Sequence, residues 1–405
     1  MDTPPKLPAG KKSFADVTYD EAMRRAEALI PLLKAHADES EKLTHMAPAV
    51  VSALHESGLL RYMQPKRWGG MELDFVSVFD LPEMLGRGDA SAAWTFTNLA
   101  AHHRLLALWD ARAQEEIWGD DPDMLIASGI AFAQGRAVKT DGGYRITGRW
   151  GFSSGVDVST WNMLACQVFD GDKIVDYRMC LVPLPDFEVI DDWQTLGMRG
   201  TGSRTVQCKD IFVPEHRALS MYTQRPGFEY PGWKVNTAAQ YRIPLSGFGG
   251  TGIGGCMTGN ARAMLDAAID MVKARSTAYT GAKMRDFQNV QLRIGMAGAK
   301  IDAGRLLLRT DCIEVQRTLE AGGTVDIPTR LRYKRNSSAG IKLVVEAVDT
   351  LFEMAGANGI YDSAPMQRMF RDAHAGGAHI NFNCDVNLSP WALVMLGGEF
   401  RSPTL

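Results

Sequence analysis

The chain has 405 residues, of which 45% are hydrophobic and 22% charged, and its net charge at pH 7 is −3. That composition is typical of a globular protein and excludes a mainly disordered chain, a coiled coil and a collagen-like repeat. The near balance of basic and acidic residues gives no electrostatic signature of a nucleic-acid partner or of an anionic membrane surface.

The cysteines and the termini indicate the compartment. Six scattered cysteines, with no CxxC pair among them, exclude a disulfide scaffold and a cysteine-based zinc site. The sequence has no run of about eighteen apolar residues, so no membrane-spanning helix is predicted. The Pro/Lys/Gly-rich N-terminal tail lacks the apolar core of a signal peptide, and the C-terminal RSPTL is not a peroxisomal signal. We therefore expect a cytoplasmic protein with reduced thiols.

Residues 18–121 predict an N-terminal helical domain, preceded by a flexible tail over 1–17. Thr18 followed by Glu21 is a capping-box pattern that opens the first helix, and Gly58 suits the end of the second. The helix over 91–109 is apolar on most faces, which predicts that it is buried. In chain order, the later helices are expected at 48–56, 76–85, 91–109 and 110–118.

Residues 122–217 predict a β domain of short antiparallel strands. The Asp170-Gly171-Asp172 turn between two apolar runs indicates a hairpin, and Pro214 ends the last strand. The strands are expected at 144–147, 161–169, 174–182 and 205–213. The aromatic, Pro-Gly-containing segment 218–244 is long for a plain connection, so it either lines a substrate pocket or packs on a neighbouring subunit.

Residues 245–405 predict a helical bundle, with helices over 261–274, 287–318 and 330–355 and a last one that begins near Pro365. The stretch from Gly247 to Gly252 matches GxGxxG. A dinucleotide fingerprint needs a strand before it, whereas Pro244 precedes this stretch and helices follow it. We interpret these glycines as sites of close helix packing or as a flexible approach to the bundle.

The histidines do not predict a metal site. His102 and His103 are adjacent and point to different faces of a helix, and His374 and His379 are five residues apart rather than the four that stack two ligands. The absence of a GxSxG motif makes an α/β-hydrolase a poor candidate. The segment Trp150–Gly155, WGFSSG, combines aromatic rings with hydroxyl groups. Such a set suits either a heteroaromatic ligand or an ordinary hairpin end.

Five motifs in order resemble the acyl-CoA dehydrogenase superfamily: the Gly69-Gly70 and Gly88–Ser91 turns, WGFSSG, the 197–203 stretch GMRGTGS with Phe212-Val-Pro214, and the GANG…R…RD pattern from Gly356 to Asp372. The resemblance covers nearly the whole chain after about residue 20. It implies an acyl-CoA dehydrogenase-like fold of N-terminal α-helices, a middle β-barrel and a C-terminal four-helix bundle, assembled as a homotetramer. The flavin-binding residues that it implies are Trp150, Phe152, Ser153, Ser154, Arg275, Gln291, Gly356 and Gly359.

One departure separates two branches of that superfamily. Many dehydrogenases carry a glutamate base in an EGT motif after the RD pair, but the stretch 371–383 has no Glu and places His379 there. This pattern is similar to the two-component flavin monooxygenases that hydroxylate p-hydroxyphenylacetate and secosteroid phenols. The resemblance implies that His102, Ser128 and His379 surround a phenol and that Ser153 contacts flavin N5. The helix phase leaves His103 open as the alternative to His102.

The implied function is the oxygenase component of a two-component flavin-dependent monooxygenase. Reduced FAD or FMN and O₂ would give a C4a-hydroperoxide, His379 would withdraw the phenol proton and Ser128 would orient the hydroxyl group. FAD is preferred because Arg275 and the Gly356–Gly359 turn suit a diphosphate and adenine. A separate NAD(P)H-flavin reductase is expected, since the chain has no nicotinamide fold. The alternatives are an acyl-CoA dehydrogenase with its base elsewhere, an N- or S-oxygenating relative, and a flavin-free scaffold.

Overall fold

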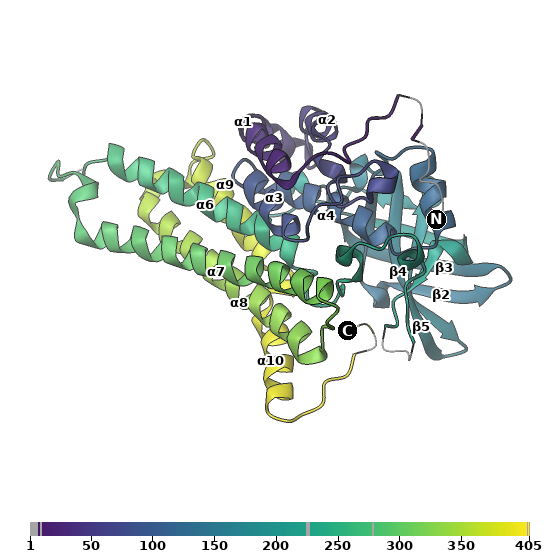
Figure 1. Cartoon of the computed structure of the whole chain (residues 1–405). Coiled ribbons are helices and arrows are strands. Elements are labelled where there is room, and N and C mark those ends of the chain that lie inside the picture. The colour runs from purple at the N-terminus through teal and green to yellow at the C-terminus, as the bar shows by residue number, and fades with distance from the viewer. Residues whose placement is uncertain (1–6, 9, 224–226, 278, 403, 405) are drawn as a thin grey trace.

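The computed structural model describes residues 7–402, apart from 9, 224–226 and 278, together with residue 404. Helices from the two ends of the chain pack together, and a β sheet formed by the middle of the chain lies against them (Figure 1). The order along the chain is helices, sheet and helices, as predicted from the sequence.

The N-terminal helices are α1 (Tyr19–Leu43), α2 (Pro48–Ser57), α3 (Ser77–Gly86), α4 (Ala90–Leu106) and α5 (Ala111–Gln114). The hydroxyl oxygen of Thr18 accepts the N–H of Glu21 at 3.3 Å, and Gly58 ends α2 with a φ of 73°. Both predicted caps are therefore confirmed. Helix α4 is buried on nearly every face, also as predicted. The short helix predicted at 110–118 is α5 followed by one π-helical turn, Glu115–Gly119.

The described strands form a single sheet in the order β6-β7-β3-β2-β4-β5-β8, with β1 beside β4. Strands β1 and β2 run parallel to β4, and the other pairs are antiparallel. Their bounds are β1 (Ile126–Gly129), β2 (Gly135–Thr140), β3 (Gly143–Ser153), β4 (Trp161–Asp170), β5 (Lys173–Pro183), β6 (Glu188–Ile190), β7 (Arg204–Pro214) and β8 (Ala218–Ser220). The first three residues of the predicted 218–244 loop are thus a strand, because they extend the edge beside β5.

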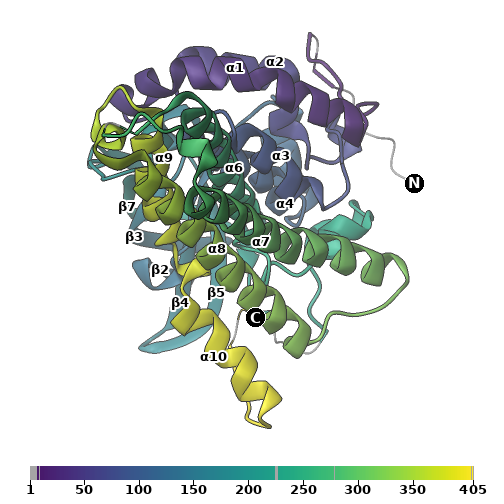
Figure 2. The same cartoon turned by 90° about the vertical axis from the view of Figure 1, so that its left-hand side faces the viewer.

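The C-terminal helices are α6 (Thr251–Ala274), α7 (Gln288–Glu320), α8 (Ile327–Ala355), α9 (Pro365–Gly377) and α10 (Cys384–Met395). Two predictions are corrected here. Helix α6 begins at Thr251 rather than at 261, and α10 was missed because Pro390 interrupts its sequence pattern. Helix α10 extends away from the rest of the molecule in both views (Figures 1 and 2).

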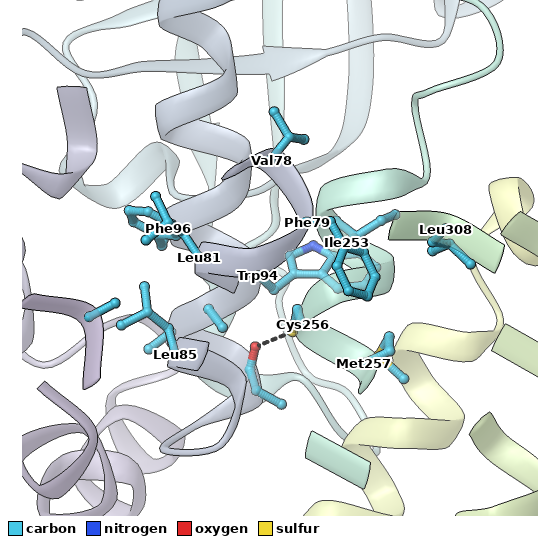
Figure 3. Close-up of a cluster of buried hydrophobic side chains, with 14 of the residues drawn as sticks. Val78, Phe79, Leu81, Leu85, Trp94, Phe96, Ile253, Cys256, Met257 and Leu308 are labelled. Carbon is cyan, nitrogen blue, oxygen red and sulfur yellow. Dashed lines mark hydrogen bonds between the residues drawn. The ribbon is translucent and has the colours of Figure 1, made fainter. Parts of the chain in front are cut away.

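The glycines of α6 let this helix approach α3 closely. A Cβ atom at Gly255 would lie 2.3 Å from the carbonyl oxygen of Phe79, and one at Gly259 would lie 2.1 Å from that of Glu83. Figure 3 shows the result, with α3, α4 and α6 sharing one buried apolar cluster in which Cys256 donates to the carbonyl oxygen of Ala90. Within the GxGxxG stretch, a Cβ atom at Gly252 would lie 2.1 Å from the hydroxyl oxygen of Thr97 on α4, as close helix packing predicts. No strand leads into the stretch, which excludes a dinucleotide fingerprint.

Among the residues that the structure describes, no helix combines the length and the apolar character needed to cross a membrane.

Candidate active site

A cavity of about 420 Å³ opens where α4, β1, the start of α6 and α8 meet. This volume is in the range of pockets for small organic ligands. Its walls are largely apolar, and they include Phe75, Phe132, Met179, Met221 and Phe248. Its polar lining groups include Asn98, His102, Ser128, Lys334, Ser337 and Asn381. A larger hollow of about 700 Å³ lies outside β7 and β8, but none of the predicted site residues lines it.

His102 and Ser128 line the same cavity from neighbouring elements. The Nδ1 atom of His102 on α4 lies 2.6 Å from the carbonyl oxygen of Ile126 on β1. A carbonyl oxygen only accepts, so Nδ1 carries the proton and the Nε2 lone pair is available. Ser128 follows two residues later on the same face of β1. Burial lowers the pKa of His102 to about 4, which keeps the ring neutral at pH 7.

His103 points the other way. Its Nδ1 accepts the indole N–H of Trp118 at 3.0 Å, and its ring stacks on that indole. It does not line the cavity, and burial lowers its pKa to about 3. The helix phase thus directs His102 to the cavity and His103 to the packing of α4 against the 115–119 turn.

His379 lies beside the cavity rather than in its wall. Its ring packs edge-on against Trp94, with centroids 5.6 Å apart, and Trp94 shares one face of α4 with Asn98 and His102. The next residues in the chain lead to Asn381, which lines the cavity. The Nδ1 of His379 accepts the backbone N–H of Asn381 at 3.2 Å, so its neutral ring carries the proton on Nε2. Burial lowers the pKa of His379 to about 4.

A bulge in β3 separates the roles of the WGFSSG residues. The register against β7 shifts between Trp150 and Ser153, and Phe152 adopts a φ of 63°. Phe152 is turned outward and is 75% exposed, whereas Ser153 is fully buried and accepts the side-chain N–H of Asn162 at 2.9 Å. Trp150 is fully buried too, and its indole N–H donates to the carbonyl oxygen of Ala165. The ring of Trp150 thus fills the core of the β domain, and the flavin contact predicted for Trp150 stays a prediction.

Hydroxyl groups from two distant motifs form a continuous chain next to this bulge. The Oγ atoms of Ser154 and Ser203 lie 2.7 Å apart, and Ser203 lies 2.7 Å from the hydroxyl of Thr201. Beside them, Trp193 packs its ring edge-on against Phe152 at 6.0 Å. An exposed and a half-buried aromatic ring beside hydroxyl groups fit the ring and the polar edge of a flavin. Sequence reasoning named Ser154 and Phe152 but missed Trp193, Thr201 and Ser203, which the 191–203 loop brings in.

The other predicted flavin ligands lie at the far end of the helical bundle. Arg275 ends α6 and donates to the carbonyl oxygen of Ala355, and it lines a hollow of about 270 Å³ together with Gly359. Gly356 takes a φ of 59° at the end of α8, and the exposed Gln291 donates to the carbonyl oxygen of Arg285. In Figure 1 the α6–α7 connection lies at the end of the molecule opposite the sheet. One chain therefore holds its predicted flavin residues in two separate places.

The 218–244 segment contributes to the cavity mainly through its first residues. Met221 lines the cavity, whereas Phe228, Tyr230 and Trp233 pack against one another. Arg104 fixes the end of the segment by donating to the carbonyl oxygens of Gln240 and Ile243.

Within the described parts of the chain, no group of three or more His, Cys, Asp and Glu side chains is placed to hold a metal ion.

Comparison with known proteins adds the family. Two family models match, "Acyl-CoA dehydrogenase, N-terminal domain" over residues 20–117 and "Acyl-CoA dehydrogenase, C-terminal domain" over residues 251–384. The flavin-dependent monooxygenase oxygenase subunit HsaA of Rhodococcus jostii (strain RHA1) is 35% identical over 94% of this chain and 98% of its own length. The oxygenase component of the FADH(2)-dependent resorcinol hydroxylase of Rhizobium sp. (strain MTP-10005) is 30% identical over 93% of this chain and 94% of its own length.

A solved structure agrees with these relatives. The crystal structure of 3-HSA hydroxylase from Rhodococcus sp. RHA1 superposes with a TM-score of 0.90 at 32% identity, covering 95% of this chain and 99% of that one. At that coverage the match extends over all three regions of the chain. With its helix–sheet–helix architecture, this chain belongs to the acyl-CoA dehydrogenase-fold family, and within it to the oxygenase components of two-component, flavin-dependent monooxygenases, which use flavin and O₂.

Proposed function

We propose that this chain hydroxylates a small phenol, using O₂ and flavin that a separate reductase has already reduced. The observation that carries the proposal is the pairing of His102 and Ser128 in one largely apolar cavity. A neutral imidazole nitrogen and a hydroxyl group are suited to bind and deprotonate a phenolic O–H. Reduced flavin, when bound, supplies the two electrons with which one oxygen atom of O₂ becomes water while the other enters the substrate.

We assign the general base to His102. Its Nδ1–H is held by Ile126, which leaves Nε2 to accept the phenol proton, and the hydroxyl of Ser128 orients the substrate oxygen. The sequence favoured His379 as the base. The hydrogen bond from Asn381 to Nδ1 of His379 supports a different role, in which its Nε2–H donates to an oxygen atom next to the cavity. A proton withdrawn from the phenol makes its ring a better nucleophile toward electrophilic oxygen.

The flavin ring is proposed to lie against Phe152 and Trp193, with the hydroxyl groups of Ser154 and Ser203 at its polar edge. The hydroxyl oxygen of Ser153 accepts a hydrogen bond from Asn162, so the hydroxyl proton of Ser153 is free to donate to another group. We propose that this group is flavin N5. Exclusion of water from the cavity by bound substrate and flavin would limit wasteful loss of hydrogen peroxide.

A second copy of the chain is proposed to complete the flavin site. Arg275 follows α6, Gln291 lies in the first turn of α7, and Gly356 and Gly359 follow α8. The α6–α7 connection lies at the end of the molecule opposite the sheet that carries Phe152 (Figure 1). Helix α7 also exposes a stripe of apolar side chains, including Leu292, Met296 and Leu306. Both observations support a homotetramer in which one chain's bundle end holds the distal part of its neighbour's flavin, with FAD preferred over FMN.

The lining of the cavity also separates this function from dehydrogenation. None of the described lining residues is an Asp or a Glu, so an acyl-CoA dehydrogenase would lack its carboxylate base here. The six free cysteines support the proposed cytoplasmic location, where a reductase partner would supply reduced flavin.

The test is a reductase-free turnover. The purified protein is mixed anaerobically with chemically reduced FAD and a phenol, O₂ is added, and hydroxylated product and hydrogen peroxide are quantified per flavin oxidised. We expect catechol-type product in a yield close to the flavin consumed. Hydrogen peroxide alone with every phenol of a size-graded series, or reduction of oxidised flavin by an acyl-CoA, would overturn the proposal.

A further inference from the structure

Lys334 and Ser337 form a polar group at one end of the cavity that the proposed chemistry does not use. Both line the cavity from one turn of α8. The ammonium group of Lys334 makes no ion pair or hydrogen bond with any described residue, and burial lowers its pKa. Ser337 is only 4% exposed, yet its hydroxyl oxygen has no partner among the described residues. A buried, unpaired hydroxyl group costs free energy unless a ligand binds it.

The N-terminus of α6 meets this pair. A Cβ atom at Gly250 would lie 2.6 Å from the hydroxyl oxygen of Ser337, so the backbone there approaches Ser337 directly. No side chain caps α6, and among the described residues the N–H groups of Gly252 and Ile253 have no acceptor. Gly250, Gly252 and Ile253 all line the cavity. Free N–H groups and the positive end of a 24-residue helix attract an anion.

The charge of the lining is also one-sided. Arg104 and Lys334 are its cations, and no described lining residue is acidic. The guanidinium group of Arg104 is committed to the carbonyl oxygens of Gln240 and Ile243, which leaves Lys334 as the cation with a free head group among the described residues. The side-chain amide of Asn381 lies beside Gly249 at the same end.

We infer that this end of the cavity binds the carboxylate of an aromatic substrate, held by Lys334, Ser337 and the N-terminus of α6. The inference rests on the proposed function, because the same molecule would present its phenol to His102 and Ser128, which line the cavity from α4 and β1. The substrate class is thereby narrowed to phenols with an acidic side chain. The GxGxxG stretch acquires a role in ligand binding that differs from a dinucleotide fingerprint.

The experiment compares two probes that differ only in charge, 4-hydroxyphenylacetate and 4-hydroxyphenylacetamide. Their dissociation constants are measured by calorimetry on the full-length protein, without turnover. The wild type should bind the carboxylate at least about tenfold more tightly than the amide, as expected for charge-assisted hydrogen bonds. Lys334→Met should reduce that preference to nearly one while leaving amide binding unchanged. Ser337→Ala should reduce it by roughly three- to tenfold.

Lys342→Met is the matched control, because Lys342 lies on the same helix but is largely exposed and pairs with Glu346. It should leave the preference unchanged. Equal binding of both probes by the wild type, no binding of the carboxylate, or an undiminished preference in Lys334→Met would overturn the inference. A flavin phosphate is the other possible source of an anion, so reduced FMN binding is measured anaerobically in parallel. Weaker FMN binding with unchanged carboxylate binding in Lys334→Met would also overturn it. These binding measurements require no catalysis. A failure of the inferred carboxylate site can therefore be distinguished from a failure of the proposed hydroxylation.

Discussion

His102 donates its Nδ1 proton to the carbonyl oxygen of Ile126 across 2.6 Å, and this contact fixes the tautomer of a ring that lines the cavity. The acceptor is a main-chain atom of the strand that also carries Ser128. The proposed base and the proposed orienting hydroxyl are thus both positioned by β1, so a shift of this strand moves both. This arrangement gives the pair a defined geometry without a carboxylate partner.

The first prediction concerns the base. His102→Asn keeps a side-chain N–H that can donate to Ile126 but removes the nitrogen that accepts the phenol proton. Hydroxylation in single turnovers should slow by roughly 10²–10⁴-fold, the usual contribution of a positioned general base. Hydrogen peroxide released per flavin oxidised should rise correspondingly. His374→Asn is the control, since His374 pairs with Asp349 on the bundle and does not line the cavity. An unchanged hydroxylation rate in His102→Asn would contradict this assignment and favour His379 as the general base.

The second prediction is the pH dependence of that step. Burial lowers the pKa of both His102 and His379 to about 4, so the neutral base persists well below the ordinary histidine value. The hydroxylation rate should therefore stay flat from pH 8 to about pH 5 and fall to half near pH 4. Rapid-quench measurements in buffers of constant ionic strength would show this limb, and His102→Asn should flatten it. A midpoint near 6.5 would mean that the working base is solvated.

The third prediction is the effect of the same burial on stability. The pKa of His102 is about 4 in the folded chain and about 6.5 in an unfolded one, so below pH 6.5 the unfolded chain binds the extra proton. Protonation of His102 therefore favours the unfolded chain, and the free energy of unfolding decreases progressively as the pH falls from 6.5 to 4. Between pH 7 and pH 5 the wild type should lose about 2 kcal/mol more unfolding free energy than His102→Asn. Urea titrations at the two pH values measure the difference, and equal losses would contradict the assigned burial.

Much of the fold could be predicted because local signals and packing agree. Thr18 and Gly58 cap their helices through hydrogen bonds with residues close in sequence, so both caps can be predicted from the sequence. The start of α6 could not be predicted in this way, because glycine has a low helix propensity. Gly255 and Gly259 are explained only by the close contact of α6 with α3. Helix α10 was not predicted because Pro390 lies inside it, and proline is unfavourable in a helix interior.

The site shows a similar division. The family resemblance implied that His102, Ser128 and His379 surround one substrate, but it did not show which nitrogen of each histidine ring is free. That depends on Ile126 and Asn381, whose main-chain groups are placed by the tertiary fold. The outward turn of Phe152 and the burial of Trp150 depend on a bulge whose register only the pairing with β7 reveals. Lys334 and Ser337 carried no motif, because helix α8 reads as ordinary bundle sequence.

The fourth prediction tests the flavin surface. Phe152→Ala removes a ring that is 75% exposed, so the melting temperature should change little, whereas reduced flavin should bind roughly 5- to 10-fold more weakly through the loss of an aromatic contact. Anaerobic fluorescence titration measures the affinity. Phe212→Ala is the control, because Phe212 is an exposed aromatic on β7 that lies outside the WGFSSG segment. Equal affinities of Phe152→Ala and Phe212→Ala for reduced flavin would show that Phe152 does not contact the flavin.

The last prediction concerns assembly. Leu292 and Met296 lie one turn apart on α7 and are 68% and 54% exposed, a cost that a neighbouring chain would relieve. The double substitution Leu292→Glu and Met296→Glu places two charges on that face without disturbing the core. Light scattering should show a tetramer for the wild type and a smaller species for the variant, with an unchanged circular dichroism spectrum. Ile174→Glu, at an exposed apolar position on β5, should keep the wild-type mass.

The same variant separates a shared flavin site from a merely adhesive interface. If Arg275 and Gly359 of one chain complete the flavin site of another, dissociation must weaken reduced-flavin binding even though Phe152, Ser154 and Ser203 remain intact. Substrate binding should be retained, because His102, Ser128 and Lys334 of the same chain line the cavity and are unchanged in the variant. A dissociated variant with wild-type flavin affinity would show that each chain binds flavin alone. A wild type that is monomeric at micromolar concentration would contradict the assembly itself.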